Sequence, residues 1–344
     1  MTNALRRTLE HILDGRDLGE DQAAALAMAL TDPDLPQALA GAFLAGLRSK
    51  GVVAEEVRGF VKAMRKLGRR PDFEPGLPAI DIVGTGGDAS GSLNLSTGAA
   101  LLTAACGLPV IKHGNRSISS RSGSADLIEQ LGLPMPMNEE AARRCLEATG
   151  FTFLFAPYYH PAMKTLAPVR TALGIRTVFN LLGPLANPGE PRFYLIGAFS
   201  LEAAQLMAQA LSGMAVERAW VVHGALGWDE ATPLGPFTAY DVRPGQVSEQ
   251  RIDPLSFGLA RATPASLHGG DSVGNLAALR AVFERRDTGA HLDALVLQAG
   301  IALHIGGHAA DVAAGIALAR ATVASGAAAD WLLNLQRQQG GAPA

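Results

Sequence analysis

Residues 81 to 126 read DIVGTGGDASGSLNLSTGAALLTAACGLPVIKHGNRSISSRSGSAD, and this stretch decides the fold that the sequence predicts. It begins in an apolar run, 79–83, that is typical of a short buried strand. A glycine-rich turn, 84–88, follows, and a segment of small apolar residues then predicts a helix that ends at Gly107. A second apolar run, 108–111, predicts another strand. The order strand, helix, strand favours a parallel α/β unit.

The turn and the residues after it have the chemistry of a phosphate site. Glycines allow positive φ and a close approach of the backbone to a ligand. We expect Ser96 or Thr97 to cap the helix, whose N-terminus offers free N–H groups to an anion. Lys112, expected just past the second strand, adds a positive charge in the crevice where open α/β sheets bind ligands. The glycine spacing matches neither of the commoner phosphate loops, because GxGxxG and the lysine of GxxxxGK[ST] are both absent.

A tight strand-to-helix turn would explain the glycines alone equally well. Asn94, Ser96 and Lys112 lie in the same strand–helix–strand unit, however, and this placement favours the phosphate site.

Composition describes an ordinary globular protein. The chain has 344 residues, of which 48% are hydrophobic and 18% are charged, enough for a large domain and a small one. The formal net charge of −3 argues against binding of nucleic acid through the whole surface. Cys106 and Cys145 lack metal-ligand spacing and are expected to be buried and reduced. No signal peptide and no uninterrupted apolar run of 18 residues is evident, so we expect a cytoplasmic protein that spans no membrane.

The rest of the chain divides at about residue 72. Residues 1–72 carry helical periodicity without a chemical constellation, and a Pro/Gly-rich linker follows them. From residue 73 to 344, strand-like runs alternate with helical patterns, which predicts an α/β domain with a central, largely parallel sheet. The fold class is therefore α/β, with a small all-helical N-terminal domain and a larger α/β domain.

Three later segments are chemically suggestive. Residues 157–177 are rich in basic and aromatic side chains, although a solvated basic helix explains them as well, and 179–188 is expected to be a turn-rich connector. Asp229 and Glu230 follow a strand and suit Mg²⁺, which takes oxygen ligands and bridges to phosphates, unless they belong to a plain acidic loop. His304 and His308 are spaced i, i+4, but the two glycines between them disfavour a helix, and we interpret both as structural.

In their order and spacing, GTGGD, NLST and KHGNRS resemble the motifs of the anthranilate phosphoribosyltransferase family. The resemblance extends over almost the whole chain, through FLFAPYYHPAMK, VRTALGIRTVFNLLGPLANP, VVHG and GGD…N. It implies a magnesium-dependent enzyme that transfers the phosphoribosyl group of phosphoribosyl pyrophosphate to the amine of anthranilate. It also implies a homodimer formed through the helical domain, with helices around 158–176 packing back on that domain.

The resemblance further implies roles for individual residues. Magnesium ligands would be Ser96, Asp229 and Glu230, and the catalytic residues would be Lys112, His113 and Arg170. Phosphoribosyl pyrophosphate would be bound by Gly84, Gly86, Gly87, Asp88, Ser92, Asn94, Ser96, Thr97, Lys112 and Ser124. Anthranilate would be bound by Gly84, His113, Asn115, His160, Met163 and Arg170.

This chain departs from the family pattern at Trp228, at Ser92 and at Gln298, and Gln298 is expected to lie away from the chemistry. Two alternatives stay open. One is an enzyme similar to pyrimidine nucleoside phosphorylases, which KHGNRS followed by GSAD disfavours. The other is a non-catalytic paralogue that binds nucleic acid or protein, which the retained Asp229, Glu230 and Arg170 and the negative net charge disfavour.

Overall fold

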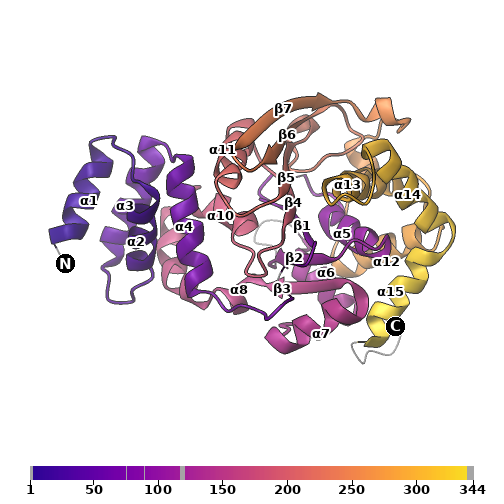
Figure 1. The fold of residues 1–344 in the computed structure, drawn as a ribbon, viewed down its shortest axis with the longest axis horizontal. Coiled ribbons are helices and arrows are strands. Elements are labelled where there is room, and N and C mark those ends of the chain that lie inside the picture. The colour runs from indigo at the N-terminus through magenta and orange to yellow at the C-terminus, as the bar shows by residue number, and fades with distance from the viewer. Residues whose placement is uncertain (1–2, 75, 89, 117–120, 339–344) are drawn as a thin grey trace.

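The computed structural model describes residues 3–74, 76–88, 90–116 and 121–338. Four helices come first, and α2 packs on α4 while α1 packs on α3. Figure 1 shows them as a bundle at one end of the molecule. Their helical periodicity is the predicted one, and its apolar faces are buried in the bundle. The four are α1 (Asn3–Leu13), α2 (Glu20–Leu30), α3 (Gln37–Lys50) and α4 (Ala54–Leu67).

A seven-stranded sheet with the order β3-β2-β1-β4-β5-β6-β7 forms the centre of the rest. The first five strands of the chain are parallel, and β6 and β7 add an antiparallel edge. The sheet is therefore largely parallel, which confirms the predicted fold class. The strands are β1 (Ile80–Gly84), β2 (Val110–Gly114), β3 (Phe151–Phe155), β4 (Phe193–Gly197), β5 (Arg218–His223), β6 (Phe237–Arg243) and β7 (Gln246–Ile252).

Helices cover both faces of this sheet. In Figure 1, α10 and α11 lie between the bundle and the sheet, and α5, α12, α13, α14 and α15 lie on the side away from the bundle. Helices α9 (Ala167–Leu173), α10 (Phe179–Leu185) and α11 (Leu201–Ser212) contribute to the core on the bundle side. The helices that contribute to the core on the other side are α5 (Leu95–Ala105), α6 (Ser124–Gln130), α7 (Glu139–Thr149), α8 (Ala156–Tyr159), α12 (Ser272–Phe283), α13 (Ala290–Ile305), α14 (Val312–Ala324) and α15 (Ala327–Gln338). Short 3₁₀ turns are η1 (Pro161–Leu166), η2 (Ala225–Gly227), η3 (Pro254–Phe257) and η4 (Pro264–Leu267).

The sheet separates two hydrophobic cores. Successive side chains of a strand point to opposite faces, so Leu195 and Trp220 join the core under α5 and α13, while Ile196 and Val221 join the core of the helical bundle. The bundle core also contains residues of α10 and α11. The bundle and one face of the sheet are thus parts of one apolar unit.

The structure corrects two of the predicted elements. Residues 179–185 form helix α10 and not a turn-rich connector, because Leu182 and Leu185 are fully buried against the bundle and outweigh the helix-breaking effect of Pro184. Strand β2 begins at Val110 and not at Leu108, so Lys112 lies inside the strand.

The basic and aromatic segment that follows β3 is not a solvated helix. It consists of α8, η1 and α9, and Tyr159 and His160 are buried within it. Elsewhere in the chain, no single helix of the described ranges is long and apolar enough to cross a membrane. The pair α14 and α15, bent by 71°, meets the length and composition criteria only when the two are joined.

Candidate active site

The candidate site lies where the strand order reverses direction. β1 is paired with β2 on one side and with β4 on the other, so the connections after β1 and β4 run to opposite sides and leave a crevice at the carboxyl ends of the strands. The glycine-rich turn starts there, at the last residue of β1. Its Thr85 amide donates to the carbonyl of Gly197 at the end of β4 (2.9 Å), and its hydroxyl accepts from the amide of Phe199 (3.1 Å).

The acidic pair after β5 holds this turn in place. The Asp229 carboxylate accepts a hydrogen bond from the amide of Gly86 (2.6 Å), and the Asp229 amide donates to Asp88 (3.3 Å). Gly86 has φ of 66°, a left-handed conformation that favours glycine. A Cβ on Gly84 would lie 2.5 Å from the Asp229 carboxylate. The turn and the acidic pair therefore fit together only with glycine at position 84.

The N-terminus of α5 holds the second carboxylate of the pair. Glu230 accepts from the amide of Ser96 (3.0 Å), and the Ser92 hydroxyl lies 3.4 Å from its other oxygen. The predicted cap at Ser96 or Thr97 is wrong, because α5 begins at Leu95 and Asn94 precedes it. A carboxylate from another loop thus takes the place of a side-chain cap at this helix end.

Asn94 instead joins three segments of the chain. Its amide donates to the carbonyl of Ser122 (3.1 Å), and its oxygen accepts from the Ser122 hydroxyl (3.1 Å) and from the amide of Asn275 in α12 (2.8 Å). Asn275 also accepts from the amide of Gly270 (2.6 Å). This network fixes the loop before α5 against the segments that lead into α6 and α12.

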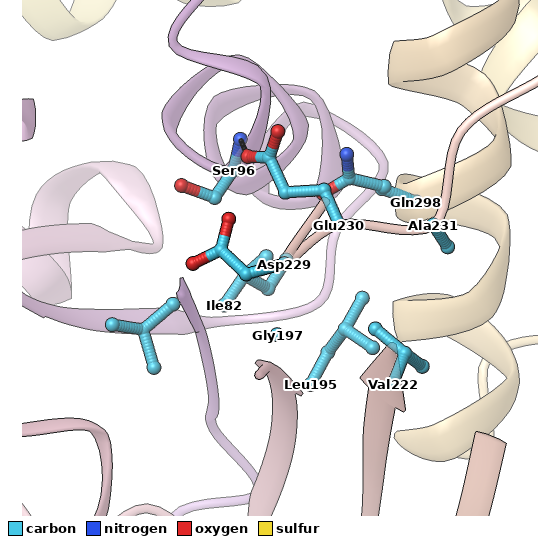
Figure 2. Close-up of a pocket in the computed structure, with 10 residues that line it drawn as sticks. Ile82, Ser96, Leu195, Gly197, Val222, Asp229, Glu230, Ala231 and Gln298 are labelled. Atoms are coloured by element: carbon cyan, nitrogen blue, oxygen red, sulfur yellow. Dashed lines mark hydrogen bonds between the residues drawn. The ribbon is translucent and has the colours of Figure 1, made fainter. Parts of the chain in front are cut away.

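A cavity of about 10 Å³ lies between these groups, roughly the room for one water molecule. Figure 2 shows the Asp229 and Glu230 side chains beside Ser96, above the ends of the strands that carry Leu195 and Val222. Gln298 of α13 lines the same cavity. The expectation that Gln298 lies away from the chemistry is wrong, since the packing of α13 on α5 brings it to the acidic pair.

Burial and mutual repulsion dominate the electrostatics of the acidic pair. Burial, and next the charge of Asp88, raise the pKa of Asp229 to about 7. Burial, and next the charges of Asp229 and Asp88, raise the pKa of Glu230 well above its ordinary value. Three carboxylates therefore crowd one edge of the sheet, an arrangement that a cation stabilises.

A layer of buried polar groups lies directly under the turn. Lys112 is 1% exposed, and its ammonium group donates to the carbonyl of Ile82. Burial lowers its pKa to about 8, against the opposing charges of Asp81 and Glu230. Asp81, in the middle of β1, accepts from the Asn187 amide (2.8 Å) and from the backbone amide of His113 (3.3 Å). Lys112 thus lies beneath the crevice rather than past the end of its strand.

Two histidines pack together beside that layer. His113 and His160 have ring centroids 5.2 Å apart in an edge-to-face arrangement, and their ring nitrogens bond to the carbonyls of Gly183 (3.0 Å) and Ala186 (3.0 Å) respectively. Burial, and next the neighbouring His160, lower the pKa of His113 to about 3. Burial lowers the pKa of His160 as well. Both imidazoles are therefore neutral near pH 7.

The predicted anthranilate residues are spread over α9, η1 and the ends of strands β1 and β2. Arg170 of α9 lies over the ring of Phe179 (5.4 Å from the guanidinium carbon to the ring centroid), and burial lowers its pKa, although a guanidinium stays charged. Met163 packs against the core of the bundle. Asn115 is exposed at the end of β2, where its carbonyl accepts from the Ser124 hydroxyl (3.1 Å).

Sequence reasoning missed Arg176 as a site residue. Its guanidinium donates to the carbonyl of Gly87 (2.6 Å) and stacks on the ring of Phe199, 3.8 Å from the centroid. Asp81 and Asn187 were missed too, although a lone acid inside an apolar strand was a usable signal for a buried polar network.

The acidic pair fits a magnesium ion. Its ligands are hard oxygens, and the repulsion among Asp88, Asp229 and Glu230 is what a divalent cation would neutralise. In the described ranges, no group of three or more His, Cys, Asp or Glu side chains is arranged to hold a metal alone. The ion would therefore take further oxygen ligands from water and from substrate phosphates, as Mg²⁺ commonly does.

Comparisons with known proteins identify the family. Residues 6–68 match the helical bundle domain of the glycosyl transferase family, and residues 76–329 match its a/b domain. The anthranilate phosphoribosyltransferase of Azorhizobium caulinodans is 43% identical over 332 residues, which cover 96% of this chain and 96% of that protein. The chain belongs to the anthranilate phosphoribosyltransferase family.

Solved members of the anthranilate phosphoribosyltransferase family share the fold over nearly the full length. The enzyme from Thermus thermophilus superposes with a TM-score of 0.89 at 39% identity, covering 98% of this chain and 100% of that one. The Saccharomyces cerevisiae enzyme, solved in complex with PRPP and Mg, superposes with a TM-score of 0.88 at 25% identity, covering 98% and 99%.

Proposed function

We propose that this chain is a magnesium-dependent enzyme that transfers the phosphoribosyl group of phosphoribosyl pyrophosphate to the amine of anthranilate. The products are N-(5-phosphoribosyl)anthranilate and pyrophosphate, in tryptophan biosynthesis. Family membership over the whole chain supports the assignment. The observation that carries it is the acidic pair, which is joined by hydrogen bonds both to the glycine-rich turn and to the N-terminus of α5.

The groups around the turn are proposed to bind phosphoribosyl pyrophosphate. The turn offers backbone amides, and the Ser92 and Ser96 hydroxyls and the Asn94 amide surround the start of α5. Ser96, Asp229 and Glu230 are proposed to hold magnesium, which when bound supplies positive charge for the departing pyrophosphate. The remaining residues of this proposed subsite are Gly84, Gly86, Gly87, Asp88, Thr97, Lys112 and Ser124.

Anthranilate is proposed to lie on the side that faces α8 and α9. Arg170 carries a planar guanidinium that suits the anthranilate carboxylate, and this pairing would orient the amine toward the ribose. His113 and His160 would form an uncharged aromatic surface against the ring. Asn115, Met163 and Gly84 complete the proposed subsite.

The chemistry places little demand on a base. The amine nitrogen forms a bond to the ribose C1 as the bond from C1 to the pyrophosphate oxygen breaks, and the extra proton on nitrogen leaves to water. Lys112, charged below pH 8, supports the negative end of this transfer. His113, with its pKa near 3, is not expected to act as a general base. A bell-shaped pH–rate profile that disappears in the His113→Ala variant would overturn that expectation.

Three further assignments belong to the same proposal. The division into domains at residue 72 is supported by the limits of the two family matches, and limited proteolysis near 69–78 would test it. A homodimer formed through the helical domain is proposed from the family resemblance, and light scattering at several concentrations measures it. Cytoplasmic localisation follows from the biosynthetic role, and cell fractionation checks it.

The deciding experiment follows the loss of anthranilate fluorescence with phosphoribosyl pyrophosphate and magnesium. We expect a fluorescence loss that depends on magnesium. In Arg170→Ala its rate should fall on the order of 100-fold or more, because a charged bidentate contact disappears from the reacting complex. Arg143→Ala is the matched control, since Arg143 is paired with Glu147 on the surface of α7. No turnover at any magnesium concentration would refute the proposal and direct tests to nucleoside phosphorolysis, then to nucleic-acid or protein binding.

A further inference from the structure

Gln298 is a buried residue whose amide nitrogen has no hydrogen-bond acceptor among the described residues. The residue is 3% exposed, and the atom in question is Nε2. Most buried polar groups in proteins are paired, so such an orphaned donor calls for an explanation.

The surroundings of Gln298 contain the acceptors that it lacks. The cavity of about 10 Å³ that it lines is also lined by Asp229, Glu230 and Ser96. Figure 2 shows Gln298 and Glu230 among the side chains that surround this cavity. Each Glu230 oxygen has one donor near it, the Ser96 amide at 3.0 Å and the Ser92 hydroxyl at 3.4 Å, which leaves capacity for further donors on a group with about four lone-pair positions.

The position of Gln298 is fixed by tight helix packing. A Cβ on Gly98 of α5 would lie 2.8 Å from the Leu295 side chain of α13, so glycine at position 98 leaves room for that leucine between the two helices. Leu295 and Gln298 are three residues apart and lie on the same face of α13. The packing of α13 on α5 therefore places Gln298 near the N-terminus of α5 and the acidic pair.

We propose that Gln298 is a positioning residue for the metal-binding acidic pair: its amide donates to the Glu230 carboxylate and holds it in place when a divalent cation binds. This inference rests on the proposed function, because it assigns Glu230 to the metal. The amide contributes no charge, so it orients the carboxylate without competing with the cation for it.

The test measures binding of Mn²⁺ together with pyrophosphate by titration calorimetry, in the full-length protein. Gln298→Met has nearly the same shape and lacks the donor. We expect its Mn²⁺ affinity to fall about tenfold, equal to about 1.4 kcal/mol. Gln298→Asn keeps an amide on a shorter side chain, and its affinity is expected to lie between those of Gln298→Met and the wild type.

The control is Thr103→Val in α5. It removes a different buried polar group, a hydroxyl whose Oγ1 also has no partner among the described residues. Its Mn²⁺ affinity should equal that of the wild type. Steady-state kinetics supply a second readout, in which Gln298→Met raises the magnesium concentration needed for half-maximal rate while kcat at saturating magnesium changes little.

Three results would overturn the inference. The first is a Gln298→Met affinity within twofold of the wild type, and the second is an equal loss in Thr103→Val. The third is a folded Gln298→Asn variant that is as weak as Gln298→Met. If the wild type turns over anthranilate and Gln298→Met binds Mn²⁺ as tightly as the wild type, only the role of Gln298 is refuted. Wild-type protein that neither binds Mn²⁺ with pyrophosphate nor turns over refutes the proposed function and this inference together.

Discussion

Asp81 offers a direct test of the buried polar layer beneath the crevice. Its carboxylate is fully buried in β1 and accepts from the His113 amide and the Asn187 side chain. Burial raises its pKa to about 7, even though the charge of Lys112 opposes that shift. Asp81→Asn keeps the shape and removes the charge. The amide has one acceptor oxygen, so one of the two donors loses its partner, at a cost of about 1–3 kcal/mol at every pH.

The pH dependence separates that constant cost from the effect of the charge. Because folding raises the pKa of Asp81 from 3.8 to about 7, the folded wild type binds more protons than the unfolded chain between these pH values. The free energy of unfolding of the wild type therefore falls as the pH rises through that window. Evaluated between pH 5.5 and 8, the loss amounts to about 2 kcal/mol, and Asp81→Asn escapes it. The stability of the variant relative to the wild type should thus rise by about 2 kcal/mol over this range.

Thermal unfolding of the wild type and the variant at several pH values measures this difference. A change of about 2 kcal/mol corresponds to a relative gain in Tm of roughly 3 °C for a chain of 344 residues, because the entropy of unfolding grows with chain length. Thr152→Val, which alters a buried neutral residue in the same sheet, is the control and should show a difference that does not vary with pH. A constant or decreasing difference for Asp81→Asn would refute the assignment of a raised pKa to Asp81.

Two further predictions concern the glycine-rich turn. Gly84→Ala places a methyl group 2.5 Å from the Asp229 carboxylate, so we expect its turnover to fall by on the order of 100-fold. Gly183→Ala is the control, because a Cβ there has no neighbouring atom within 4 Å, and it should retain the wild-type rate. Equal rates of the two variants in the fluorescence assay would contradict this prediction. Arg176→Ala removes a hydrogen bond and a cation–π contact at the turn, together worth about 1–2 kcal/mol. The KM for phosphoribosyl pyrophosphate should therefore rise about 5–30-fold with little change in Tm, and an unchanged KM, like that expected for Arg143→Ala, would count against a role for Arg176.

Local patterns predicted the elements of this fold well. Strand β1 covers Ile80–Gly84, close to the apolar run 79–83, and helix α5 ends at Ala105, just before Gly107. The sequence placed the glycine-rich turn after one strand and the acidic pair after another, and both lie at the carboxyl edge of the same sheet.

Long-range packing decided what local patterns could not. Helix α10 forms because the bundle buries its leucines, although Gly183 and Pro184 favour a turn locally. The β2 strand begins two residues late, and its register against β3 places Lys112 inside the sheet. Gln298 reaches the acidic pair only through the contact of α13 with α5. None of these contacts has a signal in the nearby sequence.

The shared core of the bundle and one sheet face has a consequence for synthesis of the chain. Helix α4 ends at Leu67, but the core that includes Phe60 also contains Val242 of β6. At a ribosomal speed of roughly 5–20 residues per second, about 10–40 s separate the emergence of these two residues. During that interval the first helices present apolar surface that the later chain covers. The nascent protein therefore passes through a stage in which its N-terminal helices expose apolar surface of the kind that chaperones bind.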